Sequence, residues 1–121
     1  MPDTYTNLVT ALKTLTQGTE PGETYTLPMA EDEWYTRPDD VSYGIVSIDF
    51  ESGQLHGDGL KMDTAYEGSV DLFSLTKGGA GWVELITGTL TTYCGGSWSL
   101  NSHTYERETG LFHWEWTFEV M

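Results

Sequence analysis

The residues that could do acid–base or metal chemistry are few and lie far apart in the sequence. The candidate bases and metal ligands are His56, His103 and His113. We expect His103 to lie opposite Glu115 on the polar face of a pair of strands. On the same face, His113 should lie opposite Tyr105. Pairing of polar side chains across strands explains both histidines without a metal. His56 lies beside a predicted turn, so we expect neither a metal nor a cofactor.

Acidic residues offer the other route to catalysis. Asp49 and Glu67 should face each other on neighbouring strands, and carboxylates held close together can have their pKa values driven apart. The same predicted face carries three further acids, Asp71, Glu115 and Glu119. Five acids spread over one face form an extended negative field rather than a catalytic dyad. We therefore expect no enzymatic activity and treat these residues as a candidate interface or the lining of a passage.

No short motif assigns an activity. Phosphate-binding loops, the Gly-x-Ser-x-Gly nucleophile turn, His-Glu-x-x-His and Cys-x-x-Cys are all missing from the sequence. Residues 78–81, Gly-Gly-Ala-Gly, precede a predicted helix whose N-terminus could bind an anion, although a helix start is the simpler explanation. Cys94 lies at the end of that helix and fits a small, partly buried residue better than a reactive thiol.

The composition describes a small and very acidic domain. With 121 residues the chain can form one hydrophobic core, and 5 basic against 19 acidic residues give a formal charge of −14. DNA phosphates repel such a protein, so a charged partner should present lysine and arginine instead. The single cysteine favours a reducing compartment. No apolar run approaches a membrane span and the first residues do not resemble a secretory signal, so we expect no membrane partner and synthesis in the cytoplasm.

The element that organises the rest is the last segment, residues 111–120. Its even positions are apolar and its odd positions mostly polar; the apolar residues are Phe112, Trp114, Trp116, Phe118 and Val120. This period of two predicts a half-buried strand with one aromatic face. We expect residues 98–107 to pair with it through a three-residue turn at 108–110, which sets Leu100 opposite Phe118.

A second hairpin is predicted in the middle of the chain, on either side of the Gly-Asp-Gly turn at 57–59. The apolar even positions of its two strands share one face. The predicted register sets Val46 opposite Val70 and, further along, Phe50 opposite Tyr66. It also sets Asp49 directly opposite Glu67, and two like charges in this position destabilise a sheet.

Two amphipathic helices complete the pattern. Residues 4–17 and residues 79–94 each carry apolar side chains at helical spacings, and glycines follow both segments. Two hairpins and two helices predict the α+β class. The expected architecture is a two-layer sandwich, in which a mostly antiparallel sheet of about four strands carries both helices on one face. The whole chain, 1–121, should form a single domain.

Residues 18–42 are predicted to be an irregular, acidic arm that contains three prolines. Short extended pieces within it could pair only at a sheet edge. A connection of this length is typically functional or mobile. Trp34, Tyr35 and Arg37 lie in it, and two interpretations stay open. The aromatic residues cover one end of the core, or the three side chains form a subunit-contact arm.

The acidic sheet face also allows more than one role. It can simply be solvated, as open faces of antiparallel sheets often are. It can instead meet a basic partner, or line a passage for a polyanion that must not adhere. Five acids on one face cost the monomer stability, which is a reason to look for a partner.

The order and spacing of these segments resemble the small tail-terminator and tail-completion proteins of tailed bacteriophages and prophages. The likeness includes the short first helix, the acidic link and the extended segment 43–50, Tyr-Gly-Ile-Val-Ser-Ile-Asp-Phe. The strand at 65–73, the glycine-led helix and the closing segment 113–120 follow in the same order. The resemblance implies a structural protein of the tail or head–tail junction, found in the virion and made in the cytoplasm of the bacterial host.

The resemblance also implies a homo-oligomeric ring, typically a hexamer, whose sheets help to build the wall. DNA would pass through the lumen without specific binding, and the partners would be tail-tube and head-connector proteins. The first helix is shorter and the 18–42 arm longer than is usual in the family, so terminator and other connector roles both stay possible. A competing function is an acidic DNA mimic that inhibits a nucleic-acid enzyme, although acids in a flexible arm imitate a rigid duplex poorly.

Overall fold

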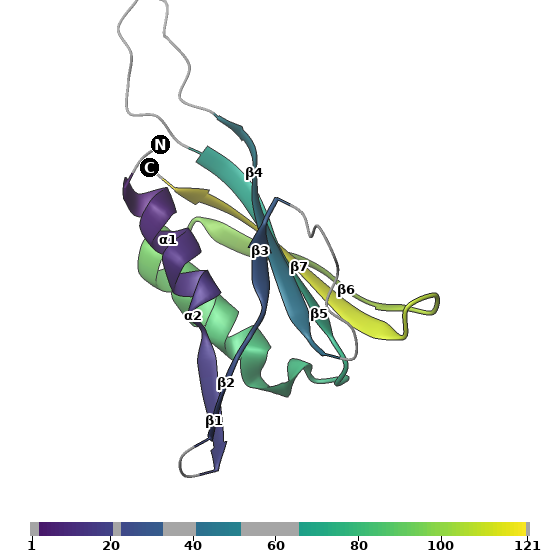
Figure 1. Cartoon of the computed structure of the whole chain (residues 1–121). Helices are drawn as coiled ribbons and strands as arrows, with labels where there is room; N and C mark the ends of the chain where they lie inside the picture. The colour runs from purple at the N-terminus through teal and green to yellow at the C-terminus, as the bar shows by residue number, and fades with distance from the viewer. Residues whose placement is uncertain (1–2, 21–22, 33–40, 52–65, 121) are drawn as a thin grey trace, which may run out of the picture.

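The structure is a computed structural model that describes residues 3–20, 23–32, 41–51 and 66–120. In chain order its elements are α1 (Asp3–Lys13), β1 (Thr16–Glu20), β2 (Glu23–Thr26), β3 (Met29–Glu31), β4 (Tyr43–Glu51), β5 (Tyr66–Ser74), a short 3-10 turn (Gly79–Gly81), α2 (Trp82–Cys94), β6 (Trp98–Glu106) and β7 (Leu111–Val120). Among the described residues, five strands form the main sheet, and both helices lie on one of its faces (Figure 1). We call that face the inner face and the opposite one the outer face.

The main sheet has the strand order β3-β4-β5-β7-β6. Its neighbouring strands are antiparallel except for β3, which runs parallel to β4. β1 and β2 pair separately, as an antiparallel hairpin that projects from the body of the domain (Figure 1). The predicted two-layer α+β architecture is confirmed, with five strands in the main sheet instead of about four. Within the segment 18–42, β2 and β3 are strands, and β3 lies at an edge of the main sheet, where short extended pieces of this segment were expected.

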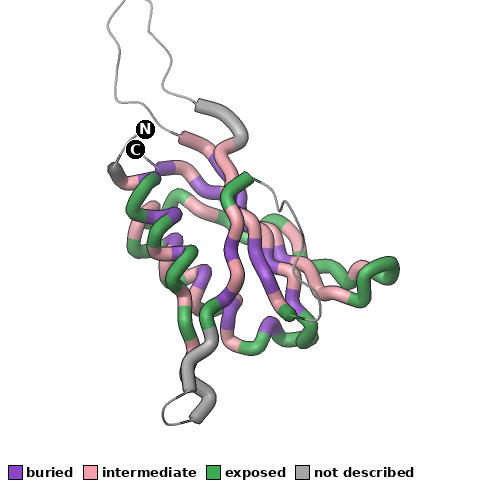
Figure 2. Tube along the Cα trace, viewed as in Figure 1, coloured by how far each residue is buried: buried purple, intermediate pink, exposed green. Residues whose placement is uncertain are grey.

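The hydrophobic core lies between the inner face and the two helices (Figure 2). The predicted alternation in β7 is confirmed, because the even-numbered residues from Trp114 to Val120 are each at most 4 % exposed. Each aromatic ring buried in this way contributes about 4–6 kcal/mol of gross transfer free energy. Elsewhere the core contains the buried side chains Leu8, Leu12, Leu27, Val46, Val70, Leu72, Ile86 and Leu90.

The first helix is shorter than predicted. α1 ends at Lys13, and residues 16–20 form β1 instead of continuing the helix to residue 17. The threonines at this point are β-branched, which favours extended backbone. The amide of Leu27 donates a 3.0 Å hydrogen bond to the carbonyl of Leu15, and this bond holds the base of the β1–β2 hairpin.

The second helix ends at Cys94 as predicted, but it begins at Trp82 instead of residue 79, after a short 3-10 turn. Gly79 and Gly81 have positive φ angles of 79° and 86° in the short turn that leads into α2. A Cβ atom at Gly79 would lie 2.5 Å from Cγ2 of Val83, so this turn requires a residue without a side chain. At the other end, Gly95 takes the C-cap position.

The register of β4 on β5 agrees with the prediction at first and then shifts by one residue. Val46 lies opposite Val70, as predicted. A bulge just before Phe50 then sets this residue opposite Glu67, so the predicted pairing of Phe50 with Tyr66 is wrong. A bulge adds one residue to one strand only, which changes every partner beyond it.

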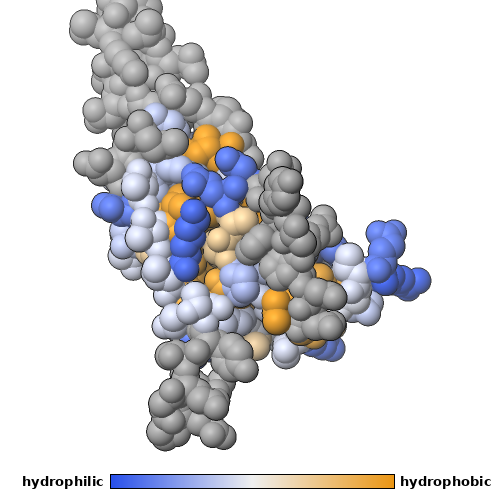
Figure 3. All heavy atoms as spheres, viewed as in Figure 1, coloured by the Kyte–Doolittle hydropathy of each residue, from blue (hydrophilic) through white to orange (hydrophobic). Residues whose placement is uncertain are grey.

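The register of β6 on β7 differs more. The turn has four residues, 107–110, instead of three, and a bulge at Asn101 adds a residue to β6. Leu100 therefore lies opposite Trp116, two residues from its predicted partner. Nδ2 of Asn101 donates a 3.0 Å hydrogen bond to Oγ1 of Thr117, which stabilises the bulge. Figure 3 shows that the tip of this hairpin is strongly hydrophilic.

Candidate functional site: the acidic outer face

The outer face brings together four of the predicted acids. Glu67 of β5 lies directly opposite Glu119 of β7. Asp71 lies opposite Glu115 on the same two strands. Side chains in such positions have Cβ atoms about 4.5–5.5 Å apart, and like charges there destabilise the sheet. We call these the two carboxylate pairs, and with Glu106 of β6 they form the acidic face.

The predicted opposition of Asp49 and Glu67 is wrong. Asp49 belongs to β4, but the bulge in that strand sets Phe50 opposite Glu67. The acid that does face Glu67 is Glu119, on the other neighbouring strand. The side chain of Asp49 lies outside the part of the chain that the structure describes, so its place on the acidic face stays a prediction.

His113 lies between two acids of this face. Its Nε2 is 2.7 Å from Oδ1 of Asp71, and its Nδ1 is 3.2 Å from Oε2 of Glu106. Since Asp71 belongs to β5 and Glu106 to β6, the imidazole on β7 bridges both neighbouring strands. The hydrogen bond with Asp71, helped by the charges of both carboxylates, raises the pKa of His113 above its ordinary 6.5 even though burial opposes this.

A row of aromatic rings crosses the outer face beside this cluster. Tyr43 of β4 stacks on Phe73 of β5 with ring centroids 4.9 Å apart, and Phe73 stacks on His113 at 4.2 Å. Tyr43 is only 3 % exposed. The predicted strand pattern did not include this row, because the odd positions of these strands were expected to be uniformly polar. The signal was the aromatic residues at two of those odd positions, 43 and 73.

The predicted partners of the two strand histidines are both wrong. His103 lies opposite Trp114 instead of Glu115, and the two rings stack with centroids 4.2 Å apart. His113 lies opposite Thr104 instead of the predicted tyrosine. The four-residue turn explains both differences, because its added residue shifts residues 102–106 by one position along β7 and so exchanges their two faces.

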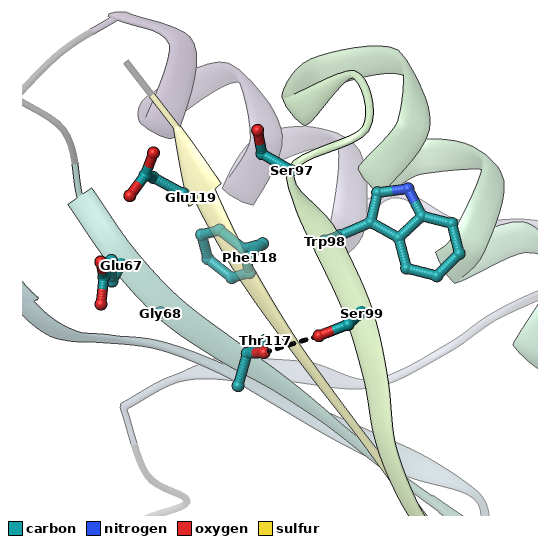
Figure 4. Close-up of a pocket in the computed structure, with 8 residues that line it drawn as sticks. All are labelled: Glu67, Gly68, Ser97, Trp98, Ser99, Thr117, Phe118 and Glu119. Atoms are coloured by element: carbon teal, nitrogen blue, oxygen red, sulfur yellow. Dashed lines mark hydrogen bonds between the residues drawn. The ribbon is translucent and has the colours of Figure 1, made fainter.

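A shallow hollow of about 530 Å³ opens beside one carboxylate pair. Its lining residues are Glu67, Gly68, Ser97, Trp98, Ser99, Thr117, Phe118 and Glu119. Figure 4 shows Ser99 and Thr117 joined below the two glutamates by a hydrogen bond between their hydroxyl groups, 3.2 Å long. The lining set contains two acids and no basic residue, so the hollow is suited to a positively charged group.

Among the described residues, no three His, Cys, Asp or Glu side chains are grouped so that they could hold a metal ion. The cluster around His113 shows why its three members do not qualify. Asp71 and Glu106 contact different nitrogens of the imidazole, so the two carboxylates do not converge on one point.

The two ends of α2 have local structural explanations. Burial raises the pKa of the Cys94 thiol to about 11, which disfavours the reactive thiolate. At the start of the helix, the carbonyl of Ala80 accepts a 2.8 Å hydrogen bond from Nε2 of Gln17. This bond ties the glycine-rich turn to β1.

The predicted subunit-contact residues Trp34, Tyr35 and Arg37 lie outside the described residues, so this contact also stays a prediction. Within the described ranges, no helix is long and apolar enough to cross a membrane.

The sequence matches no protein-family model and no curated protein sequence.

Proposed function

We propose that this protein is a structural component of the tail or head–tail junction of a tailed bacteriophage or prophage. In this proposal it acts as a tail terminator or completion protein by assembling into a homo-oligomeric ring. The observation that carries the proposal is the acidic face, where two carboxylate pairs stand in direct opposition on the sheet face that lies away from both helices. Such an arrangement costs the isolated domain stability, which is understandable if the face serves an assembly.

In the ring, the acidic face would line the lumen. The hydrogen-bonded strands β5 and β7 hold four of its acids at fixed positions, so the negative potential belongs to the rigid part of the fold. DNA phosphates are repelled by such a wall and do not adhere to it. Repulsion of this kind is what a passage for a polyanion requires.

Other surfaces would make the contacts between subunits. β6 lies at one edge of the main sheet, and its Leu100 and Tyr105 side chains are 45 % and 54 % exposed. The β1–β2 hairpin projects from a different part of the domain (Figure 1). A closed ring needs two unlike surfaces that fit each other, and these two elements are the candidates. Tail-tube and head-connector proteins are the further partners, and the virion is the expected location.

The oligomeric state tests the proposal. Sedimentation of the full chain over a wide range of concentrations should show one ring-sized species that forms as the concentration rises, and electron microscopy should show closed rings. The rings should not bind duplex DNA, even at low salt. A protein that stays monomeric at all concentrations and recruits no tail-tube protein would contradict the proposal.

The alternative function, an acidic DNA mimic, gains support from one observation. The acids of β5 and β7 are held on a rigid sheet and not in a flexible arm, and a mimic needs rigidly spaced negative charges. It predicts inhibition of a DNA-binding enzyme that added duplex DNA relieves. The double variant Glu67→Gln/Glu119→Gln should weaken that inhibition, whereas Glu108→Gln in the β6–β7 turn should leave it unchanged. Ring formation without such inhibition favours the connector.

A further inference from the structure

The cluster of Asp71, His113 and Glu106 joins three neighbouring strands near the β6–β7 turn. The two carboxylate oxygens lie 2.7 and 3.2 Å from the two nitrogens of the imidazole. An ionised carboxylate only accepts hydrogen bonds, and a ring nitrogen donates only when it carries a proton. With both carboxylates ionised, both contacts are hydrogen bonds only when His113 is the doubly protonated imidazolium. The geometry therefore selects the charged form of this histidine.

The imidazole is held in place by its surroundings. It stacks on Phe73 with centroids 4.2 Å apart, and its side chain is only 21 % exposed. Asp71 and Glu106 face it from β5 and β6, and Glu115, the next outward-facing residue on β7, lies opposite Asp71. At the far end of the ring row is the phenol ring of Tyr43 of β4. Among the described residues, the charged groups around the ring are therefore acids, and they favour its second proton.

Glu106 connects this cluster to the turn. Its Oε1 accepts a 3.2 Å hydrogen bond from the hydroxyl group of Thr109, while its Oε2 contacts His113. Its main-chain carbonyl accepts a 2.8 Å hydrogen bond from the amide of Gly110, which has a left-handed φ of 74°. A change at the Oε2 contact therefore acts directly on the residue that closes the turn.

We propose that His113 is a proton-operated latch for the β6–β7 turn. The imidazolium holds Asp71 and Glu106 together across β7. When it loses one proton to solvent, the remaining proton stays on Nε2, because Asp71 is the closer and less exposed carboxylate, 19 % against 34 % for Glu106. Nδ1 then presents a lone pair to Glu106, the contact becomes repulsive, and the turn is released.

The latch belongs to the single domain and does not rest on the proposed ring. Because the pKa of His113 is raised, the latch should open on the alkaline side of the ordinary histidine pKa. It gives the tip of this hairpin two states that differ by one proton.

Nuclear magnetic resonance of the full chain tests the latch. At about pH 6 both ring nitrogens of His113 should show the chemical shifts of a protonated imidazole. The amide resonances of Thr109 and Gly110 should titrate with the same midpoint as the ring, above the ordinary value. A ring with one protonated nitrogen at that pH, or turn amides that do not follow it, would overturn the proposal.

Two variants separate the latch from a general effect of pH. In Glu106→Gln, the side-chain amide can donate a hydrogen bond to a neutral imidazole or accept one from a charged imidazole. The titration midpoint of the His113 ring should therefore fall. The amide resonances of Thr109 and Gly110 should no longer follow the protonation of that ring. His103→Gln is the matched control, because it removes a strand histidine that stacks on Trp114 away from the cluster. In this control variant, the amide resonances of Thr109 and Gly110 should titrate as they do in the wild type. An unchanged His113 midpoint in Glu106→Gln would contradict the assigned role of this carboxylate.

Discussion

Glu67 on β5 lies directly opposite Glu119 on β7, so the sheet holds two like charges at one cross-strand position. Removing one charge should relieve this repulsion. We expect Glu119→Gln to raise the free energy of unfolding by about 0.2–1 kcal/mol at low salt. The gain should shrink at high salt, because ions screen partly exposed charges. Urea denaturation at two salt concentrations measures both effects.

The control for this charge effect is Glu108→Gln, which removes an exposed acid from the β6–β7 turn. Surface substitutions of this kind change stability by no more than about 0.5 kcal/mol. If Glu119→Gln is no more stable than this control at low salt, the opposed pair is not a source of strain.

Two glycines should respond to alanine in opposite directions. A Cβ atom at Gly68 of β5 would lie 2.2 Å from the carbonyl oxygen of Ser47 and 2.7 Å from Cζ of Phe118. Gly68→Ala should therefore destabilise the protein by about 1–3 kcal/mol through overpacking. Gly88 of α2 is exposed with nothing near the added atom, so Gly88→Ala should stabilise by about 0.5–1 kcal/mol. Equal changes in melting temperature for the two variants would contradict the close packing around Gly68.

Stability should depend on pH through His113. A histidine whose pKa is raised in the folded state contributes its full stabilisation below the unfolded value of about 6.5, and this is lost as pH rises through the folded pKa. The free energy of unfolding should therefore decrease as the pH rises above about 6.5 and through the raised pKa of His113. Denaturant titrations across this range should show a flatter profile for His113→Gln and an unchanged one for His103→Gln. The same decline in His113→Gln would assign the effect to another group.

Cys94 should react slowly with alkylating reagents in the folded protein. Burial raises its pKa from 9.0 to about 11, which lowers the thiolate fraction at mildly alkaline pH roughly 100-fold. Iodoacetamide labelling followed by mass spectrometry should be slow under native conditions and fast in urea. Equal rates in the two conditions would show that the thiol is not protected by the fold.

The parts of the fold that the sequence predicts well are those with long, uniform patterns. Residues 111–120 alternate without a break, so β7 and its buried face could be predicted from one segment. The bulges could not, because one added residue hardly changes local propensity. In β6 a signal was nevertheless present. Trp98 and Leu100 have even numbers, whereas His103 and Tyr105 have odd ones, and all four lie opposite even residues of β7. This change of phase marks the bulge between them.

The site was predictable only in part, for a related reason. Strand phase was enough to assign Glu67, Asp71, Glu115 and Glu119 to one face. Their pairing depends on β5 lying beside β7, a contact between strands of different predicted hairpins that no local pattern encodes. The bridge at His113 needs three strands in register, so treating each hairpin separately could not find it.

The bulge at Asn101 has a consequence for how the protein avoids aggregation. β6 is the last strand of the sheet, and a straight edge strand is a template on which further chains can add without limit. Asn101 interrupts that template in its middle, and its side chain is fastened to Ser99 and Thr117 by hydrogen bonds of 3.1 and 3.0 Å. An incoming strand that matches one half of β6 is out of step with the other half. The bulge that makes the register of β6 hard to predict from sequence therefore also protects the sheet from uncontrolled growth into fibres.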